Sequence, residues 1–527
     1  MFSLLASSSV VTVRPTLTRR SALAGGALAA LAGCSGESGS PAVNAPRAGV
    51  DATRASLSAG PGPSQAAWSR LRRAVRGSLA LPSDPAYDRV RLTQNPRYDG
   101  QRPLAVLSVR GADDVATGLR FAQDHGVPVA IRSGGHSYPG WSAGGSLRAL
   151  VIDVRPLSRV RLEGTTATIG SGAALAHVYD AVSLQGRAIA AGSCPTVGIA
   201  GLTLGGGVGV LTRAYGLTCD LVKSLQVVTA DGTVRTASRR REPDLFWALR
   251  GGGGGHLGVV TELTLRTAPA PTLQTAFLQW PVAALPEVIA AWQAWAPSAD
   301  ARLWSTLKVL WGKKHASGPV VLCSVTWTGP SGAFEGQLAG LLAHVPVPSV
   351  SSRSARSYRA AMFSYAGCAG VPAAQCTTGP GGALTREALS ATSHVAYDTL
   401  DAHGTSTLLA QLASGVGLLE AGISIDALGG RVADVAPDAT AFVHRDALAT
   451  VQYTATYPPG TATQADRFVR DFRAAMVPHW GNHAYVNYAD PTLPNYREAY
   501  FGANAARLAQ VRAAYDPDGF FTQPQDY

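Results

Sequence analysis

The 527-residue sequence lacks the residue patterns of a metal site and of a disulfide-rich protein. It contains only six cysteines, no Cys-x-x-Cys pair, and histidines that are scattered along the chain. Zinc sites need closely spaced ligands, so we expect no bound metal. Six cysteines are also too few to staple a chain of this size, which excludes a disulfide scaffold.

The sequence also lacks long apolar runs and long basic runs. Beyond residue 34 no apolar stretch reaches the length that spans a bilayer. No basic run with interleaved aromatic residues occurs, so nucleic-acid binding is not expected. Lysine is found only at positions 223, 308, 313 and 314, and arginine carries nearly all of the positive charge. The formal charge of +11 therefore indicates at most a mild preference for anionic surfaces.

Residues 1–34 have the pattern of a bacterial export signal rather than of a folded segment. Arg19 and Arg20 precede a short apolar stretch over residues 22–32, and this stretch ends in Leu-Ala-Gly-Cys at Cys34. The arginine pair indicates the twin-arginine route, which exports folded proteins. The final four residues resemble a lipoprotein box, so we expect Cys34 to carry a lipid. An ordinary leader is the alternative. The mature protein would then lie on the outer face of the cytoplasmic membrane or be secreted.

After this signal the composition changes twice. Residues 35 to about 67 are rich in Ser, Gly, Ala and Pro, which predicts a flexible linker. The remaining chain is longer than a usual domain, so two domains are expected.

Helical and strand patterns alternate irregularly along this remainder. Helices are expected over residues 115–122, 173–184 and 464–476, and a hairpin over 160–162 and 167–170. Further strands are expected over 127–132, 149–154, 225–229, 259–265, 306–311, 320–327, 423–430 and 449–456. This order does not repeat in regular βαβ units, so it argues against a Rossmann domain.

Two reactive side chains lie in glycine-rich turns. His136 stands in Arg-Ser-Gly-Gly-His-Ser-Tyr-Pro-Gly over 132–140, and Cys194 stands in Gly-Ser-Cys-Pro-Thr-Val-Gly over 192–198. A lone cysteine is more often a small buried hydrophobe than a reactive group, so the flanking sequence decides. The second turn continues into a glycine cluster at 205–209, and another glycine cluster follows at 251–255.

These motifs closely resemble those of the berberine-bridge-enzyme-like FAD-linked oxidases, a bacterial member being indicated here. The family is a branch of the vanillyl-alcohol-oxidase superfamily with a PCMH-type FAD-binding domain. The resemblance covers about residues 85–527. It implies an α+β, two-domain fold in which an antiparallel sheet roofs the flavin. The expected parts are an FAD-binding domain over 68–270, a substrate domain over 271–470, and a C-terminal segment over 471–527 that returns to the FAD-binding domain.

The resemblance further implies that FAD is held by two covalent bonds. His136 would bond the 8α-methyl of the flavin and Cys194 would bond C6. The glycine clusters do not follow a Rossmann pattern, but bare backbone amides can cradle a diphosphate. The other expected FAD contacts are Arg132, Ser133, Gly134, Gly135, Ser137, Tyr138, Gly198, Gly201, Leu202, Gly205, Gly206, Gly207, Val208, Gly209, Val260 and Asn487.

Four residues are expected to act on the substrate. Tyr485 and Tyr488 match the family's catalytic segment, and on a regular strand they would point to opposite faces. Only one could then face the flavin, and we expect Tyr488, either as base or as orienting group. A free tyrosine titrates near ~10, so a basic role needs a lowered pKa or a partner. Gln452 and Asp426 are expected on the roof strands, where they would contact substrate unless they face solvent.

Three positions near Cys194 bear on the chemistry. Many relatives carry a tyrosine where this chain has Val208, and a histidine where it has Leu202, so the set of groups around the base departs from the family pattern. Val197 matches a gatekeeper position, where a small valine is associated with oxidases. Oxygen is therefore the expected acceptor and hydrogen peroxide the expected product.

The resulting hypothesis is an exported, monomeric FAD oxidase that acts on an alcohol group of a carbohydrate or a glycosylated metabolite. An oxidative cyclase that forms a C–C or C=C bond is an alternative, and a non-catalytic flavin-carrying surface protein is another. Cys368 and Cys376 flank a short loop and could form a local disulfide outside the cell, or remain two free thiols.

Overall fold

The computed structural model describes residues 62–527. The predicted signal and most of the predicted linker lie outside the described residues. The predicted linker reached residue 67, but helix α1 (Gln65–Ala74) already begins at Gln65, where the Ser64 hydroxyl caps it. Of the helices in the described part, none has both the length and the apolar character needed to cross a membrane.

A four-stranded sheet leads to the His136 turn. Its strands are β1 (Ser78–Ala80), β2 (Ala105–Ser108), β4 (Leu150–Asp153) and β3 (Val129–Arg132), in that order. The neighbours β2, β4 and β3 run parallel, and β4 is buried along its whole length, as parallel strands usually are. The predicted strands 127–132 and 149–154 are confirmed.

Helix α3 (Ala112–Asp124) covers this sheet beside α1, with the rings of Trp68 and Phe121 centred 4.7 Å apart. It starts three residues earlier than predicted. Gly111 holds the N-cap position without a side-chain bond. The Asp114 carboxylate instead accepts from the backbone N–H groups of Arg76, Gly77 and Arg110, which ties the neighbouring loops together.

A second, five-stranded antiparallel sheet completes the first half of the described chain. It comprises β5 (Val160–Glu163), β6 (Thr166–Gly170), β10 (Val259–Arg266), β8 (Val222–Val228) and β9 (Val234–Ser238), in that order. The predicted hairpin and the strands near 225 and 260 are confirmed. Short elements connect these sheets: α2 (Tyr87–Val90), α4 (Leu175–Ser183), β7 (Arg187–Ala188), α5 (Ile199–Leu204), α6 (Thr212–Tyr215), α7 (Pro243–Ala248) and β11 (Ala268–Pro269).

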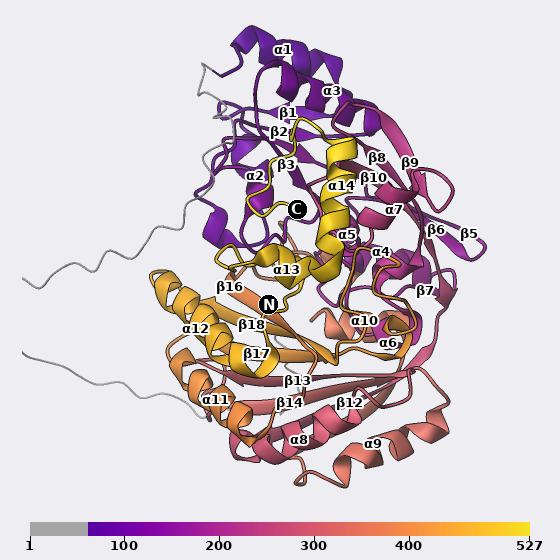
Figure 1. The fold of residues 1–527 in the computed structure, drawn as a ribbon, viewed down its shortest axis with the longest axis vertical. Helices are drawn as coiled ribbons and strands as arrows, with labels where there is room; N and C mark the ends of the chain where they lie inside the picture. Colours follow the sequence, from indigo (N-terminus) through magenta and orange to yellow (C-terminus); the bar gives the residue numbers. More distant parts are fainter. Residues whose placement is uncertain (1–61) are drawn as a thin grey trace, which may run out of the picture. The chain divides into compact units, whose positions relative to one another are not determined.

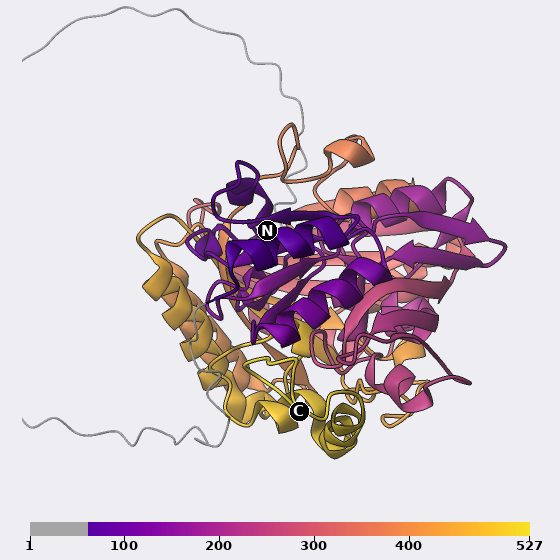
Figure 2. The same cartoon turned by 90° about the horizontal axis from the view of Figure 1, so that it is seen from above.

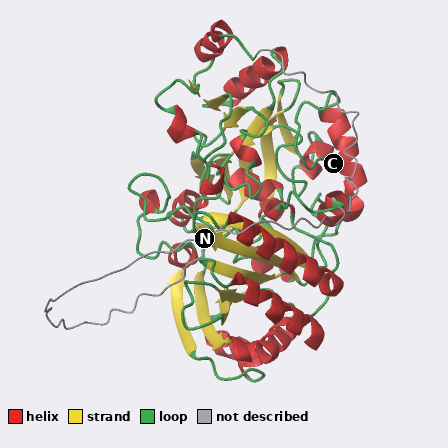
Figure 3. Cartoon of the chain, turned by 90° about the vertical axis from the view of Figure 1, so that its left-hand side faces the viewer, coloured by secondary structure: helices red, strands yellow, loops and turns green. Residues whose placement is uncertain are grey.

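A seven-stranded antiparallel sheet forms the second half. Its order is β15 (Val350–Ser357), β12 (Thr272–Pro281), β14 (Val320–Trp327), β13 (Leu303–Trp311), β17 (Glu420–Ala427), β18 (Ala449–Tyr457) and β16 (Ala388–Ala396). Helices α8 (Leu285–Trp295), α9 (Phe334–Leu342), α11 (Ala402–Leu412) and α12 (Ala462–Trp480) pack on one face of it (Figures 1 and 3). The opposite face is left for the site described below.

The C-terminal segment returns to the first half of the described chain (Figures 1 and 2). Its helices are α13 (Tyr496–Phe501) and α14 (Ala505–Tyr515). The Tyr527 hydroxyl donates to the Gly252 carbonyl at 2.6 Å, and Arg507 pairs with Asp244 at 2.9 Å. Val486–Tyr488 is a single 3-10 turn, so the geometry of a regular strand does not apply to Tyr485 and Tyr488.

Candidate flavin-binding and active site

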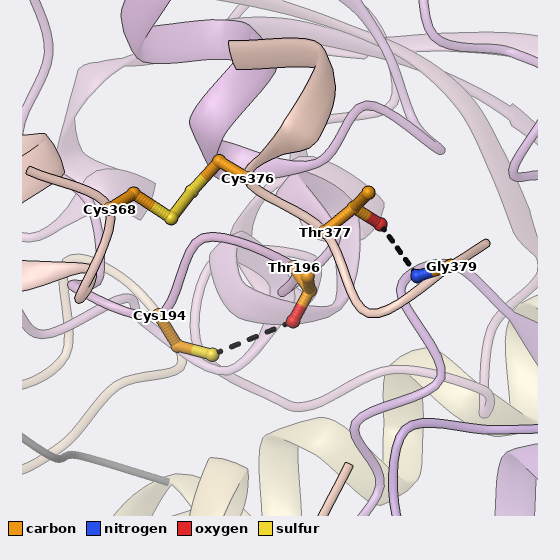
Figure 4. The surroundings of a disulfide bond; sticks show 6 residues. All are labelled: Cys194, Thr196, Cys368, Cys376, Thr377 and Gly379. Carbon is orange, nitrogen blue, oxygen red and sulfur yellow. Dashed lines mark hydrogen bonds between the residues drawn. A yellow bond between two sulfur atoms is a disulfide. The ribbon is translucent and has the colours of Figure 1, made fainter. Parts of the chain in front are cut away.

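His136 and Cys194 converge on one hydroxyl group. The Nε2 atom of His136 lies 2.9 Å from Thr196 Oγ1, and the Cys194 sulfur lies 3.8 Å from the same oxygen (Figure 4). Both residues line one cavity of about 360 Å³, a size typical of small-molecule sites. The structure thus brings the two predicted attachment residues to one place.

The 58 positions that separate His136 from Cys194 in the sequence are bridged by direct packing of their two turns. A Cβ atom on Gly134 would lie 2.2 Å from the backbone nitrogen of Gly198, and a Cβ on Gly198 would lie 2.3 Å from the backbone nitrogen of Gly134. Such distances are far below van der Waals contact. Glycine is therefore required at both positions for the two turns to meet backbone to backbone.

Arg132 does not line the cavity and instead supports the chain that leads into the His136 turn. Its guanidinium donates to the carbonyls of Val90 and Arg91 and to Asp153 at 3.0 Å, and its side chain is fully buried. A buried charge is tolerated only when it is paired and hydrogen-bonded in this way. The structure therefore does not place Arg132 as a direct FAD contact, and we assign it to holding the end of β3.

Burial sets the charge of both attachment residues. It lowers the pKa of His136 to about 4, so the imidazole is neutral at physiological pH. Burial also raises the pKa of Cys194, while hydrogen bonds to Thr196 lower it. A neutral imidazole keeps a lone pair for nucleophilic attack, whereas the thiol must first lose its proton.

Most of the predicted FAD contacts line the same cavity. They are Ser133, Gly134, Gly135, Ser137, Tyr138, Gly198, Gly201, Leu202, Val208, Gly209, Val260 and Asn487. Val197 also lines it, as an oxygen gate must. Gly253, Gly254 and Gly255 of the second glycine cluster belong to the lining as well.

Gly205, Gly206 and Gly207 are not on the cavity wall. A Cβ on Gly205 would lie 2.1 Å from the side-chain oxygen of Asn487, and one on Gly207 would lie 2.3 Å from the Thr218 hydroxyl. These glycines therefore allow the C-terminal segment and a neighbouring turn to approach the backbone. The expectation that they cradle the diphosphate is not supported by their position.

The residues present fit an elongated flavin dinucleotide. Two nucleophiles lie in one part of the cavity, and the glycine turn at 253–255, with positive φ at Gly253 and Gly255, lies in another part of its wall. A Cβ on Gly201 would meet no atom within 4 Å, so the first turn of α5 leaves open space. His136, Cys194, Gly201, Val260 and Asn487 are the residues that would hold the cofactor.

The two candidate tyrosines have different environments. Tyr488 lines the cavity and stacks on Tyr138, with ring centroids 5.6 Å apart and planes inclined by 13°. Tyr485 is buried elsewhere, where its hydroxyl accepts from the Gly207 N–H and from Asn487, each at 2.8 Å. The choice of Tyr488 agrees with the structure, although a 3-10 turn and not a strand separates the two. Tyr485 is not among the residues that line the cavity, and its catalytic role stays a prediction.

The pKa of Tyr488 is shifted upward, whereas a tyrosine that acts as a base needs a lowered pKa. Burial raises the pKa of Tyr488 well above its ordinary value, and the neighbouring Tyr138 and Asp426 raise it further. Burial also raises the pKa of Asp426, while Thr306 and Lys308 lower it. Near neutral pH the phenol keeps its proton, so the carboxylate is the better proton acceptor and the phenol is a hydrogen-bond donor.

Asp426 and Gln452 stand on the cavity face of the seven-stranded sheet. Gln452 donates a hydrogen bond to the Tyr138 hydroxyl, which places it against the aromatic pair. Along β17 and β18 the polar residues face the cavity and their apolar neighbours, such as Ile425 and Val451, face the helices. The alternative that Asp426 and Gln452 face solvent is therefore wrong.

Several cavity residues were not predicted from the sequence. They are Trp304, Thr306, Lys308, Ser324, Tyr365, Ser424 and Thr454. On β13 the cavity residues Trp304, Thr306 and Lys308 stand at every second position, and Lys308 is the charged residue of that strand. This alternation could have identified a polar face, but only the tertiary structure shows that the face borders the cavity.

A loop closed by a disulfide lies beside the Cys194 turn (Figure 4). Cys368 and Cys376 are bonded, so the disulfide rather than the pair of free thiols is confirmed. Both half-cystines are buried in the apolar core of the first half of the described chain. The loop thus joins α10 (Tyr358–Tyr365) of the second half to the FAD-binding elements.

Comparisons with known proteins agree with this site. The FAD binding domain model matches residues 103–238, and the berberine and berberine like model matches residues 484–526. The chain is 31% identical over 458 residues to the FAD-linked oxidoreductase YgaK of Bacillus subtilis, covering 85% of this chain and 96% of that protein. It is 30% identical over 456 residues to a chitooligosaccharide oxidase of Gibberella zeae, covering 80% and 87%.

Solved structures show the same architecture. Wild-type BBE-like 1 of Physcomitrella patens superposes with a TM-score of 0.79 at 27% identity, covering 87% of this chain and 98% of that chain. Fold and site together define an oxidoreductase that binds FAD. The chain belongs to the berberine-bridge-enzyme-like family of FAD-linked oxidoreductases.

Proposed function

We propose that this protein is an oxidase that removes two electrons from an alcohol group of a carbohydrate or of a glycosylated metabolite and reduces oxygen to hydrogen peroxide. One observation carries the proposal: the His136 and Cys194 turns meet in a cavity whose opposite wall is a polar sheet face that bears Asp426. The similarity to a chitooligosaccharide oxidase supports a carbohydrate as the substrate class.

The side chains of the cavity suggest how the proton is handled. When bound, FAD supplies the acceptor for the hydride and returns the two electrons to oxygen. The Asp426 carboxylate accepts the proton of the substrate hydroxyl, and the protonated Tyr488 hydroxyl orients the substrate oxygen. Gln452 and Tyr138 fix the position of the Tyr488 ring through their hydrogen bond and the ring stack.

Two covalent bonds to FAD form part of the same proposal. The shared contact of His136 and Cys194 with Thr196 supports it, because one flavin edge could then reach both atoms. Val197 on the cavity wall supports oxygen as the acceptor. Denaturation followed by mass spectrometry of flavin-bearing peptides tests the attachment. We expect one cross-linked pair of peptides that contains both residues, and flavin released into the supernatant would contradict the covalent model.

The activity itself is tested with the flavin-loaded protein and a panel of sugars. We expect bleaching of the oxidised flavin spectrum under anaerobic conditions with at least one sugar, and peroxide formation in air. A substrate that bleaches the flavin and yields a cyclised or desaturated product would point to an oxidative cyclase instead. If no sugar, alkaloid or phenol reduces the flavin, a non-catalytic flavin carrier is the better description.

We further propose export by the twin-arginine route and a lipid on Cys34. The arginine pair and the Leu-Ala-Gly-Cys sequence support this, and export in the folded state suits a protein that must first acquire FAD. Fractionation of cells that express wild type or Cys34→Ala tests it. Wild type is expected in the membrane fraction and the variant in the soluble exported fraction. A variant that remains in the membrane fraction would contradict the lipid anchor.

A further inference from the structure

Trp304 on β13 carries a buried hydrogen-bond donor that the described protein does not satisfy. Its side chain is only 6% exposed and lines the cavity, and its indole nitrogen has no hydrogen-bond partner among the described residues. A buried tryptophan N–H normally finds an acceptor, because an unsatisfied donor loses its hydrogen bond to water without replacement. The missing acceptor points to a ligand in the cavity.

The neighbouring tryptophans of the same half show the contrast. Each of four indoles donates to an acceptor within the protein: Trp280 to the Pro346 carbonyl, Trp292 to the Ser305 hydroxyl, Trp295 to the Gln337 carbonyl and Trp327 to the Pro330 carbonyl. These four satisfy their donors from their own surroundings. Trp304 differs from them because its indole nitrogen has no acceptor among the described residues, while its side chain lines the cavity.

Tyr365 provides a second aromatic wall beside Trp304. The two ring centroids are 6.2 Å apart with an interplanar angle of 88°, so the rings meet edge to face. The Tyr365 hydroxyl shares a hydrogen bond of 2.6 Å with Thr326, which is the cross-strand partner of Trp304. The same strand pair therefore holds both rings, and the arrangement exists before any ligand binds.

Polar groups connect this aromatic corner to the proposed catalytic carboxylate. Thr306 follows Trp304 on the same face of β13 and pairs across the sheet with Ser324 on one side and Asp426 on the other. All of them line the cavity. Trp304 is thus two residues along β13 from Thr306, which is directly opposite Asp426 on β17.

An apolar ring face, a free N–H donor and nearby hydroxyls suit a sugar ring. The C–H face of a pyranose packs on an aromatic ring, and a ring or hydroxyl oxygen accepts from an indole N–H. We propose that Trp304 and Tyr365 form a subsite for a second sugar ring, next to the ring that is oxidised beside Asp426. This inference rests on the proposed carbohydrate oxidase function, and it makes an oligosaccharide of at least two units the preferred substrate.

The test compares wild type with Trp304→Phe, which keeps an aromatic ring and removes only the donor. Steady-state oxidation of glucose and of cellobiose is measured, together with calorimetric binding of cellobiose to the flavin-loaded protein. We expect about a three- to tenfold loss of kcat/KM for cellobiose, with glucose changed less than about twofold. Cellobiose binding should weaken by the same factor. Trp311→Phe, on the same strand but outside the cavity lining, is the matched control and should behave as wild type.

Different results separate the subsite from the proposed function. Equal effects of Trp304→Phe on glucose and cellobiose, or no effect on either, would overturn the subsite while leaving the oxidase intact. Wild-type protein that neither binds nor oxidises any sugar, although another alcohol reduces its flavin, would overturn the subsite and the carbohydrate class together. Binding of cellobiose that depends on Trp304 without oxidation would retain the subsite and contradict the proposed reaction.

Discussion

At the scale of single residues, the proposed function assigns the proton acceptor to a carboxylate and not to a phenol. A tyrosine is a base only when its pKa is lowered, and burial raises the pKa of Tyr488 instead. The family motif matches both Tyr485 and Tyr488, and we expected Tyr488 to face the flavin, but a motif does not contain the charges that other segments bring to the site. Asp426 comes from a strand more than 60 positions away along the chain and shares the cavity with Tyr488.

We predict that Asp426→Asn retains bound flavin but reduces it about 10³-fold more slowly, since a positioned general base contributes about 10²–10⁴-fold. Stopped-flow reduction of the flavin under anaerobic conditions measures this. The wild-type rate should also fall as pH decreases through the pKa of Asp426, which burial raises above its ordinary value. In the variant the rate should no longer fall in this way as pH decreases. An Asn variant that reduces its flavin at the wild-type rate would exclude Asp426 as the base.

Val197 allows a second prediction at this scale. Replacing it with leucine adds a methylene group at the cavity wall and should hinder access of oxygen to the flavin. Val197→Leu should slow reoxidation by oxygen by roughly tenfold or more, an added barrier of about 1.4 kcal/mol. Reduction by substrate should change little. The rates of reduction and reoxidation are measured separately by stopped flow, and unchanged reoxidation in air would contradict the gate.

At the scale of elements, the contact between the two attachment turns depends on glycine. Gly198 has no room for a Cβ, which would lie 2.0 Å from the Ser133 hydroxyl oxygen. Gly198→Ala should therefore separate the turns and destabilise the protein by about 1–3 kcal/mol, the usual cost of overpacking. We also expect loss of covalent flavin, measured as the flavin absorbance that remains with denatured protein.

Gly100→Ala is the control for this prediction, because a Cβ there would meet no atom within 4 Å. It should keep both stability and covalent flavin. Full covalent flavin in Gly198→Ala would show that the two turns need not touch for attachment.

At the scale of the whole molecule, buried neutral histidines make the fold sensitive to acid. Burial lowers the pKa of His256 to about 3 and that of His444 to about 3. In the unfolded chain these residues would gain a proton near pH ~6.5, whereas the folded protein keeps them neutral. Stability is thus complete above pH ~6.5 and declines as pH falls toward the folded-state value, by up to about 1.4 kcal/mol per pH unit for each histidine.

We therefore predict a lower urea midpoint at pH 5.0 than at pH 7.5. His444→Asn should reduce this difference, because it removes one histidine whose pKa is lowered in the folded protein. His177→Asn, at an exposed position of α4, should leave the difference as in wild type. A midpoint that does not depend on pH would show that these histidines do not resist protonation in the folded state.

The sequence by itself determined the local elements and the family. The apolar strand at 149–154, the hairpin at 160–170 and the strand at 320–327 follow from side-chain periodicity, which is a local property. The His136 and Cys194 turns were identifiable because their glycines leave a distinctive local pattern. Periodicity did not identify the 3-10 turn at Tyr488, since a single turn has too few residues to show a period.

The tertiary structure alone decided which side chains share the cavity. It showed that Arg132, Tyr485 and the glycines at 205–207 support the fold around the cavity, because each is occupied by partners from distant segments. It also brought Trp304, Thr306 and Lys308 to the cavity, since a strand pattern shows that one face is polar but not what lies opposite. Long-range contacts and burial set these roles and pKa values, and a local stretch of sequence does not determine either contacts or burial.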